Sequence, residues 1–418
     1  MSLVRPFFLW RDSEAVGPPN ATLVFGASAN ACACPYAIST TGELVKSPKV
    51  AVIGLGTMGA QCLWQLSRRG IDVTGYETYA PGHARAGAGG DSRLFRTVEL
   101  EDARYSPVVA RADELWDELQ KESRRELRTI TGVLLTGAPE DPEMQRAVQN
   151  AAATGTPHMI WNERTLVRRI PQFRPDPGDI AIWDARGGFI RPELSVATAA
   201  GVAERLGARV CRNRQVLDVS QSSDRVHIRT DAGTDIYDRA IVAVGAWTPK
   251  LLPRFRDLIL PRRLISAWFF ARDAEYLAGL PPFIRPLSTY AYGVPTVDGN
   301  AVKIGLGFAH HMRADDPDRV ERTVQPDELA PFQEVVQRYL PGLDPHPMRT
   351  ETYLEGYTPT RREWIGEHPD MPGVLVLAGF SGHGFKECPA IGEAAVDRLL
   401  GSTPTVDLDF LEDGRAPF

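Results

Sequence analysis

Residues 49–77 read KVAVIGLGTMGAQCLWQLSRRGIDVTGYE, and this stretch decides the fold. The β-branched run Lys49–Ile53 is typical of a buried parallel strand. Gly54–Gly59 follows it at once with the spacing G-x-G-x-x-G. The next residues predict a helix over Ala60–Arg69 and a second strand over Asp72–Tyr76. This order of strand, glycine turn, helix and strand is that of a Rossmann unit.

The residues of the turn have separate expected roles in binding a dinucleotide. Gly54 permits the tight turn, Gly56 lets the backbone approach a pyrophosphate, and Gly59 lets the helix pack close to the strand. The helix N-terminus presents free N–H groups and a positive dipole end to phosphates, and Thr57 and Met58 of the turn are also expected to bind the cofactor. The turn therefore predicts a phosphate-binding cradle.

The residues after the first helix narrow the choice of cofactor. Glu77 ends the second strand, where a carboxylate accepts hydrogen bonds from a ribose diol. FAD and NAD both satisfy these features. Pro81–Gly90 is rich in Gly and Ala, which suits close backbone contact with a long extended cofactor. Arg93 and Arg96 are three apart, so their guanidinium groups could share one region, and the alternative is a solvated basic pair.

Two distant segments extend the sheet. Asp238–Trp247 predicts a buried strand that ends in glycine, and another strand precedes the glycine-rich loop Gly379–Lys386. Pro389–Leu400 predicts a helix, so the loop leads to a second helix terminus suited to anions. The alternative for His383 and Lys386 is an exposed pair of loop residues.

The predicted fold class is α/β + β: a discontinuous Rossmann-type cofactor domain with an inserted antiparallel-sheet substrate domain. Residues 1–47 carry little periodicity and are expected to form a disordered extension, with a poor secretory signal as the alternative. The expected divisions are 48–131, 187–261 and 357–418 for the cofactor domain, and 132–186 and 262–356 for the substrate domain.

Composition excludes several classes of partner. The formal net charge is −6 and no run of Lys and Arg occurs, so nucleic acid is not expected as a partner. No apolar stretch approaches the roughly 20 residues that cross a bilayer, so no membrane association is expected. Five scattered cysteines, Cys32, Cys34, Cys62, Cys211 and Cys388, indicate a reducing compartment, and we expect a cytoplasmic protein without a metal site.

Several of these motifs together resemble the monomeric sarcosine oxidase and N-methyltryptophan oxidase family of flavin amine oxidases. The resemblance runs from about residue 49 to residue 412 and rests on the following segments: Gly54–Gly59, Gly90–Arg96 (GDSRLFR), Thr131–Leu134, Gly245–Trp247 and Ala378–Lys386 (AGFSGHGFK). It implies FAD in a Rossmann-type domain, a substrate domain built on an antiparallel sheet, and a monomer.

The resemblance also implies roles for individual residues. Arg96 and Lys386 match the pair that grips the substrate carboxylate, and two cations make chemical sense there. Tyr292 and Tyr357 match the two active-site tyrosines, and Lys303 matches the lysine that promotes oxygen reduction. Arg93 and His383 complete the expected catalytic set beside the flavin. The residues expected to bind the cofactor are Gly54, Gly56, Thr57, Met58, Gly59, Glu77, Asp91, Ser92, Arg93, Gly245, Trp247, Gly382, His383, Gly384 and Lys386.

The sequence departs from the family pattern at two positions. The family attaches its flavin through a cysteine two residues before the second tyrosine, and Glu355 stands there. We therefore expect non-covalent FAD. The family's active-site histidine, four residues beyond the oxygen-site lysine, is replaced by Gly307. This replacement predicts more space in the wall of the substrate pocket and a substrate other than sarcosine.

These features lead to one preferred function and two alternatives. We expect an FAD-dependent oxidase that acts on the C–N bond of a small N-alkyl or cyclic amino acid and gives an imine and hydrogen peroxide. The alternatives are a dehydrogenase that passes electrons to another acceptor and a flavin-binding subunit without turnover. Reoxidation in air separates the first alternative from the oxidase, and flavin bleaching by an amine excludes the second.

Overall fold

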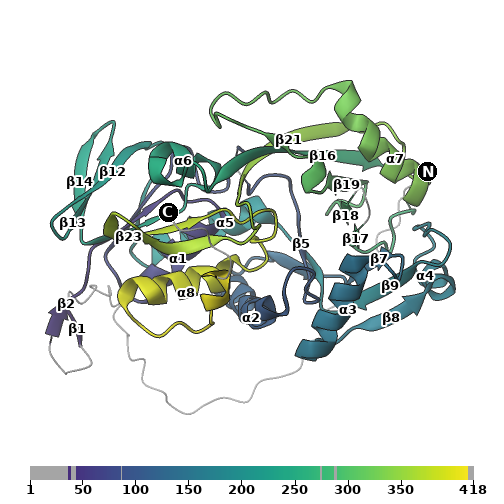
Figure 1. Cartoon of the computed structure of the whole chain (residues 1–418), viewed down its shortest axis with the longest axis horizontal. Helices are drawn as coiled ribbons and strands as arrows, with labels where there is room; N and C mark the ends of the chain where they lie inside the picture. Colours follow the sequence, from purple (N-terminus) through teal and green to yellow (C-terminus); the bar gives the residue numbers. More distant parts are fainter. Residues whose placement is uncertain (1–35, 39–43, 86, 274, 287–289, 413–418) are drawn as a thin grey trace, which may run out of the picture. The chain divides into compact units, whose positions relative to one another are not determined.

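The computed structural model describes residues 36–38, 44–85, 87–273, 275–286 and 290–412 (Figure 1). Most of the predicted extension, residues 1–47, lies outside this set. Within it, β1 (Tyr36–Ile38) and β2 (Leu44–Lys46) pair as antiparallel strands.

A parallel sheet draws its strands from distant parts of the chain, as predicted. The strand order is β11 (Arg209–Cys211), β4 (Val73–Tyr76), β3 (Val50–Ile53), β15 (Arg239–Val242), β23 (Met371–Ala378) and β22 (Trp364–His368). Neighbouring strands run parallel except for β22, which pairs antiparallel with β23 at the edge. The sheet is therefore discontinuous in sequence.

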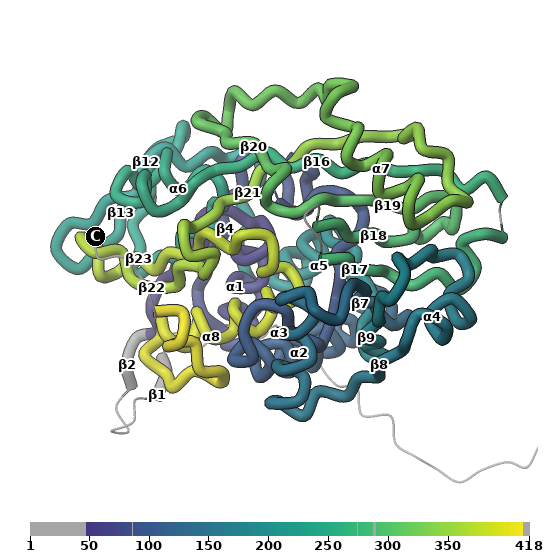
Figure 2. The backbone as a smooth tube through the Cα atoms, turned by 45° about the vertical axis from the view of Figure 1, so that its right-hand side comes forward, coloured from purple at the N-terminus to yellow at the C-terminus, as the bar shows by residue number. Residues whose placement is uncertain are grey.

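Both faces of β3 are covered, which explains its unbroken apolar run. Val50 and Val52 belong to the core beneath a layer of helices, whereas Ala51 and Ile53 belong to the core on the other face. The helices of the first layer include α1 (Thr57–Arg68), α5 (Pro192–Arg205) and α8 (Cys388–Leu400), with α2 (Ser106–Ser123) packed against α8 (Figures 1 and 2). The opposite face packs against the sheet of β12 (Val216–Ser222), β13 (Arg225–Thr230) and β14 (Gly233–Tyr237).

Gly59 provides a direct test of the packing between the glycine turn and α1. A Cβ atom on Gly59 would lie 1.8 Å from the carbonyl oxygen of Gly54, so the turn and the helix would have to separate. We expect Gly59→Ala to lower the free energy of unfolding by about 1–3 kcal/mol and to reduce the FAD content. Thermal unfolding and flavin absorbance measure both effects.

Gly201→Ala in α5 is the matched control, because a Cβ atom there meets nothing within 4 Å. Alanine in a helix interior is favoured over glycine by up to about 1 kcal/mol, so this variant should be as stable as the parent or more stable. A Gly59→Ala protein that melts like its parent and holds FAD equally well would contradict the packing role.

A second large sheet carries the other half of the site. Its main path runs β20 (Met312–Arg313), β16 (Leu260–Phe270), β19 (Ala301–Leu306), β18 (Ala291–Pro295), β17 (Phe283–Arg285), β7 (Val133–Gly137), β9 (Ile180–Asp184) and β8 (Met159–Asn162), while β21 (Arg349–Tyr357) pairs with β16. Most pairs are antiparallel, as predicted, but β7 and β17 pair in parallel. A small sheet of β5 (Arg93–Phe95), β10 (Gly188–Ile190) and β6 (Arg128–Ile130) is also present.

One face of the second sheet packs on an apolar core and the other bears polar side chains. Val302 and Ile304 of β19 join a core that includes residues of α4 (Glu163–Arg169) and α7 (Ala330–Tyr339). Because side chains alternate along a strand, Lys303 points to the opposite face. Tyr292 of β18 lies opposite Gly305, so it shares that face with Lys303. Strand alternation therefore places Lys303 and Tyr292 on the same side of this sheet, away from that core.

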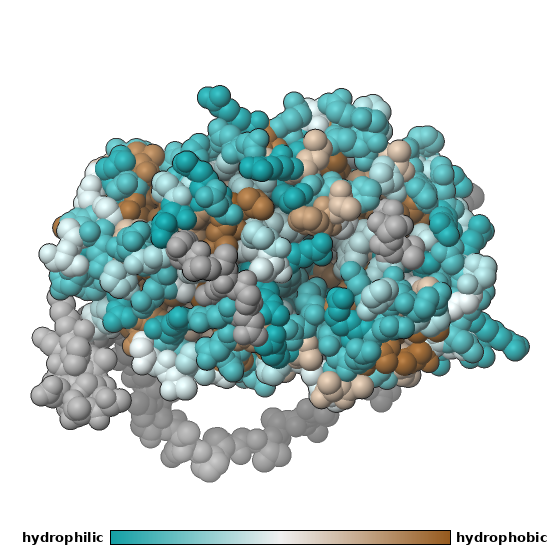
Figure 3. Space-filling view, viewed as in Figure 1, coloured by the Kyte–Doolittle hydropathy of each residue, from teal (hydrophilic) through white to brown (hydrophobic). Residues whose placement is uncertain are grey.

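The surface and the cysteines give little information about the function. On the face drawn in Figure 3, hydrophilic side chains predominate and hydrophobic ones form small separate patches. In the described part of the chain, no helix is long and apolar enough to cross a membrane, and no group of three or more His, Cys, Asp and Glu could hold a metal ion. Cys62, Cys211 and Cys388 are free thiols, and Cys32 and Cys34 lie outside the described residues.

Candidate active site

Two adjoining cavities, of about 700 and 600 Å³, contain most of the predicted site residues. The larger is lined by these predicted cofactor residues: Gly54, Gly56, Thr57, Met58, Glu77, Arg93, Gly245, Trp247, Gly382 and Gly384. The smaller is lined by these predicted catalytic and substrate residues: Arg93, Arg96, Tyr292, Gly307, Tyr357, His383 and Lys386. The residues common to both linings are Gly87, Arg93, Glu355, Gly382 and Phe385. A cofactor in one cavity can therefore meet a substrate in the other.

The glycine turn forms a cradle at the larger cavity. Gly54 has a φ of +83°, and a Cβ atom there would lie 2.8 Å from the Ala243 carbonyl oxygen. A Cβ atom on Gly56 would meet nothing within 4 Å, so the backbone faces open space. No side chain caps the N-terminus of α1. Its first N–H groups are therefore available to phosphate oxygens, and the residues fit a dinucleotide.

Glu77 is held as an ionised acceptor beside this cradle. Its Oε2 accepts from the Leu55 N–H at 2.9 Å, its Oε1 accepts from the Tyr79 N–H at 3.1 Å, and His83 Nε2 lies 3.3 Å from Oε1. Burial alone would raise the pKa of Glu77, but His83 and these N–H groups outweigh it and lower the pKa. A carboxylate of this kind can accept further hydrogen bonds from ribose hydroxyls.

Five of the predicted cofactor residues do not line the larger cavity. Gly59 packs beneath the turn, and His383 and Lys386 line the smaller cavity alone. Asp91 is exposed and its carboxylate accepts from Arg349 Nη1 at 2.5 Å. Ser92 is buried, and its carbonyl oxygen accepts from Lys303 and Arg93. These last two residues shape the loop rather than the cavity wall.

The two predicted tyrosines lie in the smaller cavity. The Tyr292 ring lies over Gly305, where a Cβ atom would be 2.2 Å from the ring. The Tyr357 hydroxyl donates to His311 Nδ1 at 2.8 Å, because His311 Nε2 donates to the Leu306 carbonyl oxygen at 2.9 Å and fixes the tautomer. Burial raises the pKa of both phenols and lowers that of His311 to about 4. All three side chains are therefore uncharged at neutral pH.

The wall at Gly307 is not enlarged in the way that the sequence predicted. Gly307 lines the smaller cavity, but a Cβ atom on it would lie 2.6 Å from the Tyr290 Cβ atom and 3.0 Å from its ring. Tyr290 therefore occupies the space beside the glycine, and His311 supplies an imidazole four residues further on. The prediction of extra space is wrong because a neighbouring side chain fills it.

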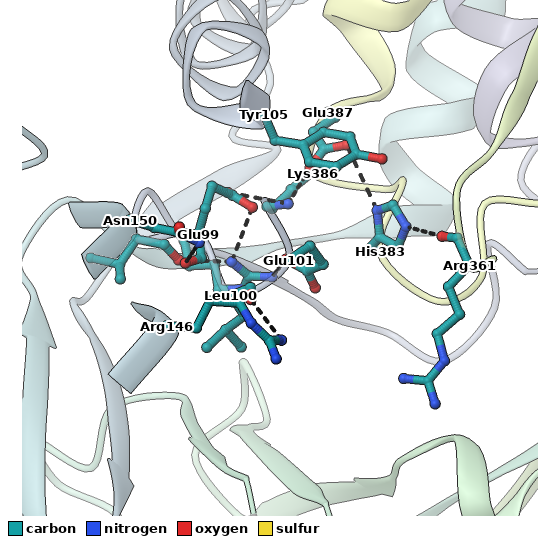
Figure 4. Close-up of polar contacts among 12 residues, drawn as sticks. Glu99, Leu100, Glu101, Tyr105, Arg146, Asn150, Arg361, His383, Lys386 and Glu387 are labelled. Carbon is teal, nitrogen blue, oxygen red and sulfur yellow. Dashed lines mark hydrogen bonds and ion pairs between the residues drawn. The ribbon is translucent and has the colours of Figure 1, made fainter. Parts of the chain in front are cut away.

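Arg96 and Lys386 are brought together, but both are already paired with carboxylates. Figure 4 shows Lys386 beside Glu99 and Glu387. Arg96 Nη2 lies 2.5 Å from Glu101 Oε2, and Arg96 Nη1 lies 3.3 Å from Glu99 Oε2. Lys386 Nζ lies 3.4 Å from Glu99 Oε1 and donates to the carboxylate of Glu387. Burial alone would lower the pKa values of both cations, but these carboxylates raise them. Both side chains remain charged.

His383 lies at the edge of the same cluster (Figure 4). Its Nε2 donates to the Arg361 carbonyl oxygen at 3.0 Å, and its Nδ1 is 4.0 Å from Glu387 Oε2. Burial alone would lower the pKa of His383, but Glu363 and Glu387 raise it above its usual value. These contacts orient the imidazole on the wall of the smaller cavity.

Lys303 lines neither cavity. It is fully buried, and its Nζ donates to the carbonyl oxygens of Gly90, at 3.0 Å, and Ser92. Burial and the neighbouring Arg93 lower its pKa well below the usual value. The side chain thus lies behind the loop that leads into Arg93, and the alternative in which it points to solvent is excluded.

The comparison with known families decides the identity. A family model described as FAD dependent oxidoreductase matches residues 49–398. The chain belongs to this family. The predicted cofactor, FAD, is confirmed, and so are the predicted family resemblance and the oxidoreductase class.

Individual relatives cover most of the chain. The monomeric sarcosine oxidase of Streptomyces avermitilis is 31% identical over 369 residues, which are 85% of this chain and 94% of that protein. The N-methyl-L-tryptophan oxidase of Salmonella heidelberg is 29% identical over 364 residues, which are 85% of this chain and 96% of that protein. The open form of NikD, an unusual amino acid oxidase essential for nikkomycin biosynthesis, has a TM-score of 0.77 at 20% identity over 88% of this chain and 97% of that one. The predicted fold class is confirmed.

In this FAD-dependent enzyme, Glu355 stands where the resemblance implies a cysteine. Its Oε1 accepts from the Gly382 N–H at 2.8 Å, and its side chain lines both cavities. Burial raises its pKa. Cys388, the other residue considered for attachment, is fully buried, lines neither cavity, and has a pKa raised well above its usual value by burial. Its thiol is therefore poorly placed to react.

Several residues of the site were missed by the sequence analysis. Glu99, Glu101 and Glu387 surround the predicted cations, and His311 contacts Tyr357. One signal was present: Glu387 adjoins Lys386, and two glutamates follow Arg96 within five positions. Buried charges are usually paired, so glutamates beside predicted buried cations were candidates for partners.

Proposed function

We propose that this enzyme is an FAD-dependent oxidase of the C–N bond of a small carboxylate-bearing amine, with an imine and hydrogen peroxide as products. One observation carries the proposal: the cavity lined by the dinucleotide cradle adjoins the cavity that holds Arg96 and Lys386, with Arg93 in both linings. The names of relatives that are amine or amino acid oxidases support it.

The larger cavity suits FAD along its length. The N-terminus of α1 would hold the pyrophosphate, Glu77 the adenosine ribose, and the residues shared by the two cavities the flavin ring. FAD, when bound, accepts a hydride from the amine and delivers the electrons to oxygen. The protein supplies binding, orientation and a site from which water is largely excluded.

The smaller cavity orients the amine. Arg96 and Lys386 would hold the substrate carboxylate by charge-assisted hydrogen bonds, which fix its direction as well as its position. Tyr292 and Tyr357 would form aromatic walls around the reacting carbon, and His311 holds the Tyr357 hydroxyl in place. We also propose that the enzyme acts as a monomer, which the name of one relative, a monomeric sarcosine oxidase, supports.

A dehydrogenase is the second candidate, and one observation favours it. Lys303, the residue expected to promote oxygen reduction, lines neither cavity, and burial lowers its pKa well below the usual value. Above this lowered pKa the amine is neutral, and a neutral amine would stabilise superoxide less than an ammonium does. Electrons would then pass to a carrier rather than to oxygen.

The experiment that tests the proposed function is an anaerobic screen of N-alkyl and cyclic amino acids against the FAD-loaded enzyme. Each compound is paired with its carboxamide, which keeps the amine and removes the anion. We expect at least one amino acid to bleach the flavin absorbance, and its carboxamide to act only at much higher concentration. Bleaching by the carboxamides alone would overturn the carboxylate assignment.

The bound FAD should leave the denatured protein. A carboxylate at Glu355 cannot form the thioether that a cysteine forms, and Cys388 lines neither cavity. We expect acid precipitation to release the yellow colour into the supernatant. Flavin that stays with the washed precipitate would contradict non-covalent binding.

A further inference from the structure

The smaller cavity has an unusual charge balance where the substrate carboxylate would bind. The permanent cations Arg96 and Lys386 lie within ion-pair distance of the carboxylates of Glu99, Glu101 and Glu387. Acids therefore outnumber these two cations before any ligand arrives. His383 contributes a further positive charge when it is protonated.

Most of this cluster is shielded from water. Glu387 and Glu99 have 0% and 1% of their surfaces exposed, Lys386 has 4% and Arg96 has 7%, whereas Glu101 is partly exposed at the cavity. A substrate carboxylate at Arg96 and Lys386 would place a fourth carboxylate beside two cations. Like charges at such distances do not all remain ionised, because each raises the pKa of the others.

We propose that Glu99 is a specificity-determining residue whose protonation accompanies binding of a carboxylate at Arg96 and Lys386. The proposal rests on the proposed function, since it takes these two cations as the carboxylate site. Binding transfers one proton from solvent to Glu99, which lets both cations turn to the incoming anion. The pocket thus selects carboxylates in a pH-dependent manner.

The geometry identifies Glu99 among the three carboxylates. Glu101 and Glu387 each hold one cation closely, whereas Glu99 bridges both at 3.3 and 3.4 Å. In the described part of the chain, Glu99 Oε1 and Glu387 Oε2 are both buried without a hydrogen-bond partner, but Glu387 has a close donor on its other oxygen and Glu99 does not. The carboxylate with the most distant donors is the one most easily protonated.

The pKa shifts within the cluster agree with the choice of Glu99 as the residue that is protonated. Burial raises the pKa of Glu99 to about 7, although Lys386 and Arg96 act to lower it. Burial alone would also raise the pKa of Glu101, but Arg96 and Lys386 bring it well below its usual value. The charged and titratable groups around Glu99 are Arg96 and Glu101 on its own segment, His383, Lys386 and Glu387 on the loop and start of α8, and Tyr105, Glu143, Tyr290 and Glu363 on surrounding segments.

The protonation of Glu99 determines how the affinity for the carboxylate changes with pH. An incoming anion raises the pKa of Glu99 further, so the complex holds the proton more tightly than the free enzyme does. Affinity is then highest below pH 7 and falls as the pH rises through and above the pKa of about 7. With one proton taken up, the loss is about tenfold per pH unit.

The test uses cyclopentanecarboxylate, a carboxylate that has no amine to oxidise or titrate. Its binding to the FAD-loaded enzyme is followed by the change in flavin absorbance between pH 6 and pH 8.5, and proton uptake by a pH indicator in weakly buffered solution. We expect about one proton taken up per ligand at pH 8. Binding at pH 8 without proton uptake, or no binding at pH 6, would overturn the proposal.

Two variants complete the test. Glu99→Gln keeps the shape of the side chain, and should remove the pH dependence and tighten binding at pH 8.5 by roughly tenfold or more. Glu143→Gln, in the same cavity but paired with neither cation, should bind like the parent. If Glu143→Gln loses the pH dependence instead, Glu143 is the residue that takes up the proton and the assignment to Glu99 is wrong.

Lys386→Met separates the two claims. If this variant binds the probe as well as the parent, the carboxylate site of the proposed function is wrong. If it loses binding while the parent binds without taking up a proton, the carboxylate site stands and the role of Glu99 fails. The proton measurement on the parent enzyme needs no variant, so it holds even if Glu99→Gln folds poorly.

Discussion

Lys303→Met should slow the reaction of the reduced enzyme with oxygen by orders of magnitude, while anaerobic flavin reduction by substrate stays within a few-fold of the parent. Methionine keeps the length and packing of the side chain and removes its charge. The first electron that oxygen accepts creates an anion, and a fixed ammonium in a site with little water stabilises that charge better than bulk water does. Stopped-flow measurement of the two half-reactions checks the prediction.

The contacts of Lys303 sharpen this test. The side chain is fully buried and donates to the carbonyl oxygens of Gly90 and Ser92, so any influence passes through a loop that ends at Arg93. Burial lowers the pKa of Lys303, so the oxygen reaction of the parent enzyme should slow as the pH rises and the ammonium loses its proton. Removal of the side chain should abolish this pH dependence.

Lys121→Met, on the exposed side of α2, is a control that removes a lysine remote from the cavities. Each variant must hold FAD as fully as the parent before its rates are compared. If Lys303→Met leaves both half-reactions unchanged, Lys303 supports the loop alone, and the dehydrogenase becomes the stronger candidate.

Lys386→Ala and Arg96→Ala should each weaken the apparent affinity for an amino acid substrate by about 2–5 kcal/mol, or roughly 30- to 4000-fold. Each loss leaves the substrate carboxylate with one partner and also leaves buried glutamates without compensation. Rapid mixing without oxygen gives the concentration dependence and the limiting rate of flavin reduction separately, and we expect the first to change more.

Lys386→Arg is the matched control for charge, because it keeps a cation in the cluster while changing its geometry. It should retain more affinity than Lys386→Ala. Flavin reduction with an unchanged concentration dependence in both alanine variants would remove Arg96 and Lys386 from the carboxylate site.

The nucleotide-binding half could be predicted because its signals are local. The strand, turn and helix from Val50 to Arg68 are set by neighbouring residues, and the structure places β3 and α1 within three residues of the predicted bounds. The β-branched run and the glycine spacing carry their physical causes within about 30 positions. The distant strand β15 was recognised for the same reason.

The charge cluster could not be predicted in the same way. Glu99 and Lys386 are 287 positions apart, and their contact depends on how β5 and the loop before α8 pack. The sequence therefore indicated two cations but not the carboxylates that hold them. Gly307 gave a similar error, because the Tyr290 side chain that fills its space comes from another segment. The parallel pairing of β7 with β17 in the second large sheet also depends on contacts across about 150 positions.

Anaerobic mixing of the FAD-loaded enzyme with the best amino acid of the screen, with and without cyclopentanecarboxylate, tests amine oxidation at the junction of the two cavities most directly. We predict complete bleaching of the flavin, a rate that saturates with amine concentration, one imine or its hydrolysis product per flavin, and slower bleaching when the carboxylate competes. A flavin that every amine leaves oxidised, although dithionite reduces it, would contradict the account.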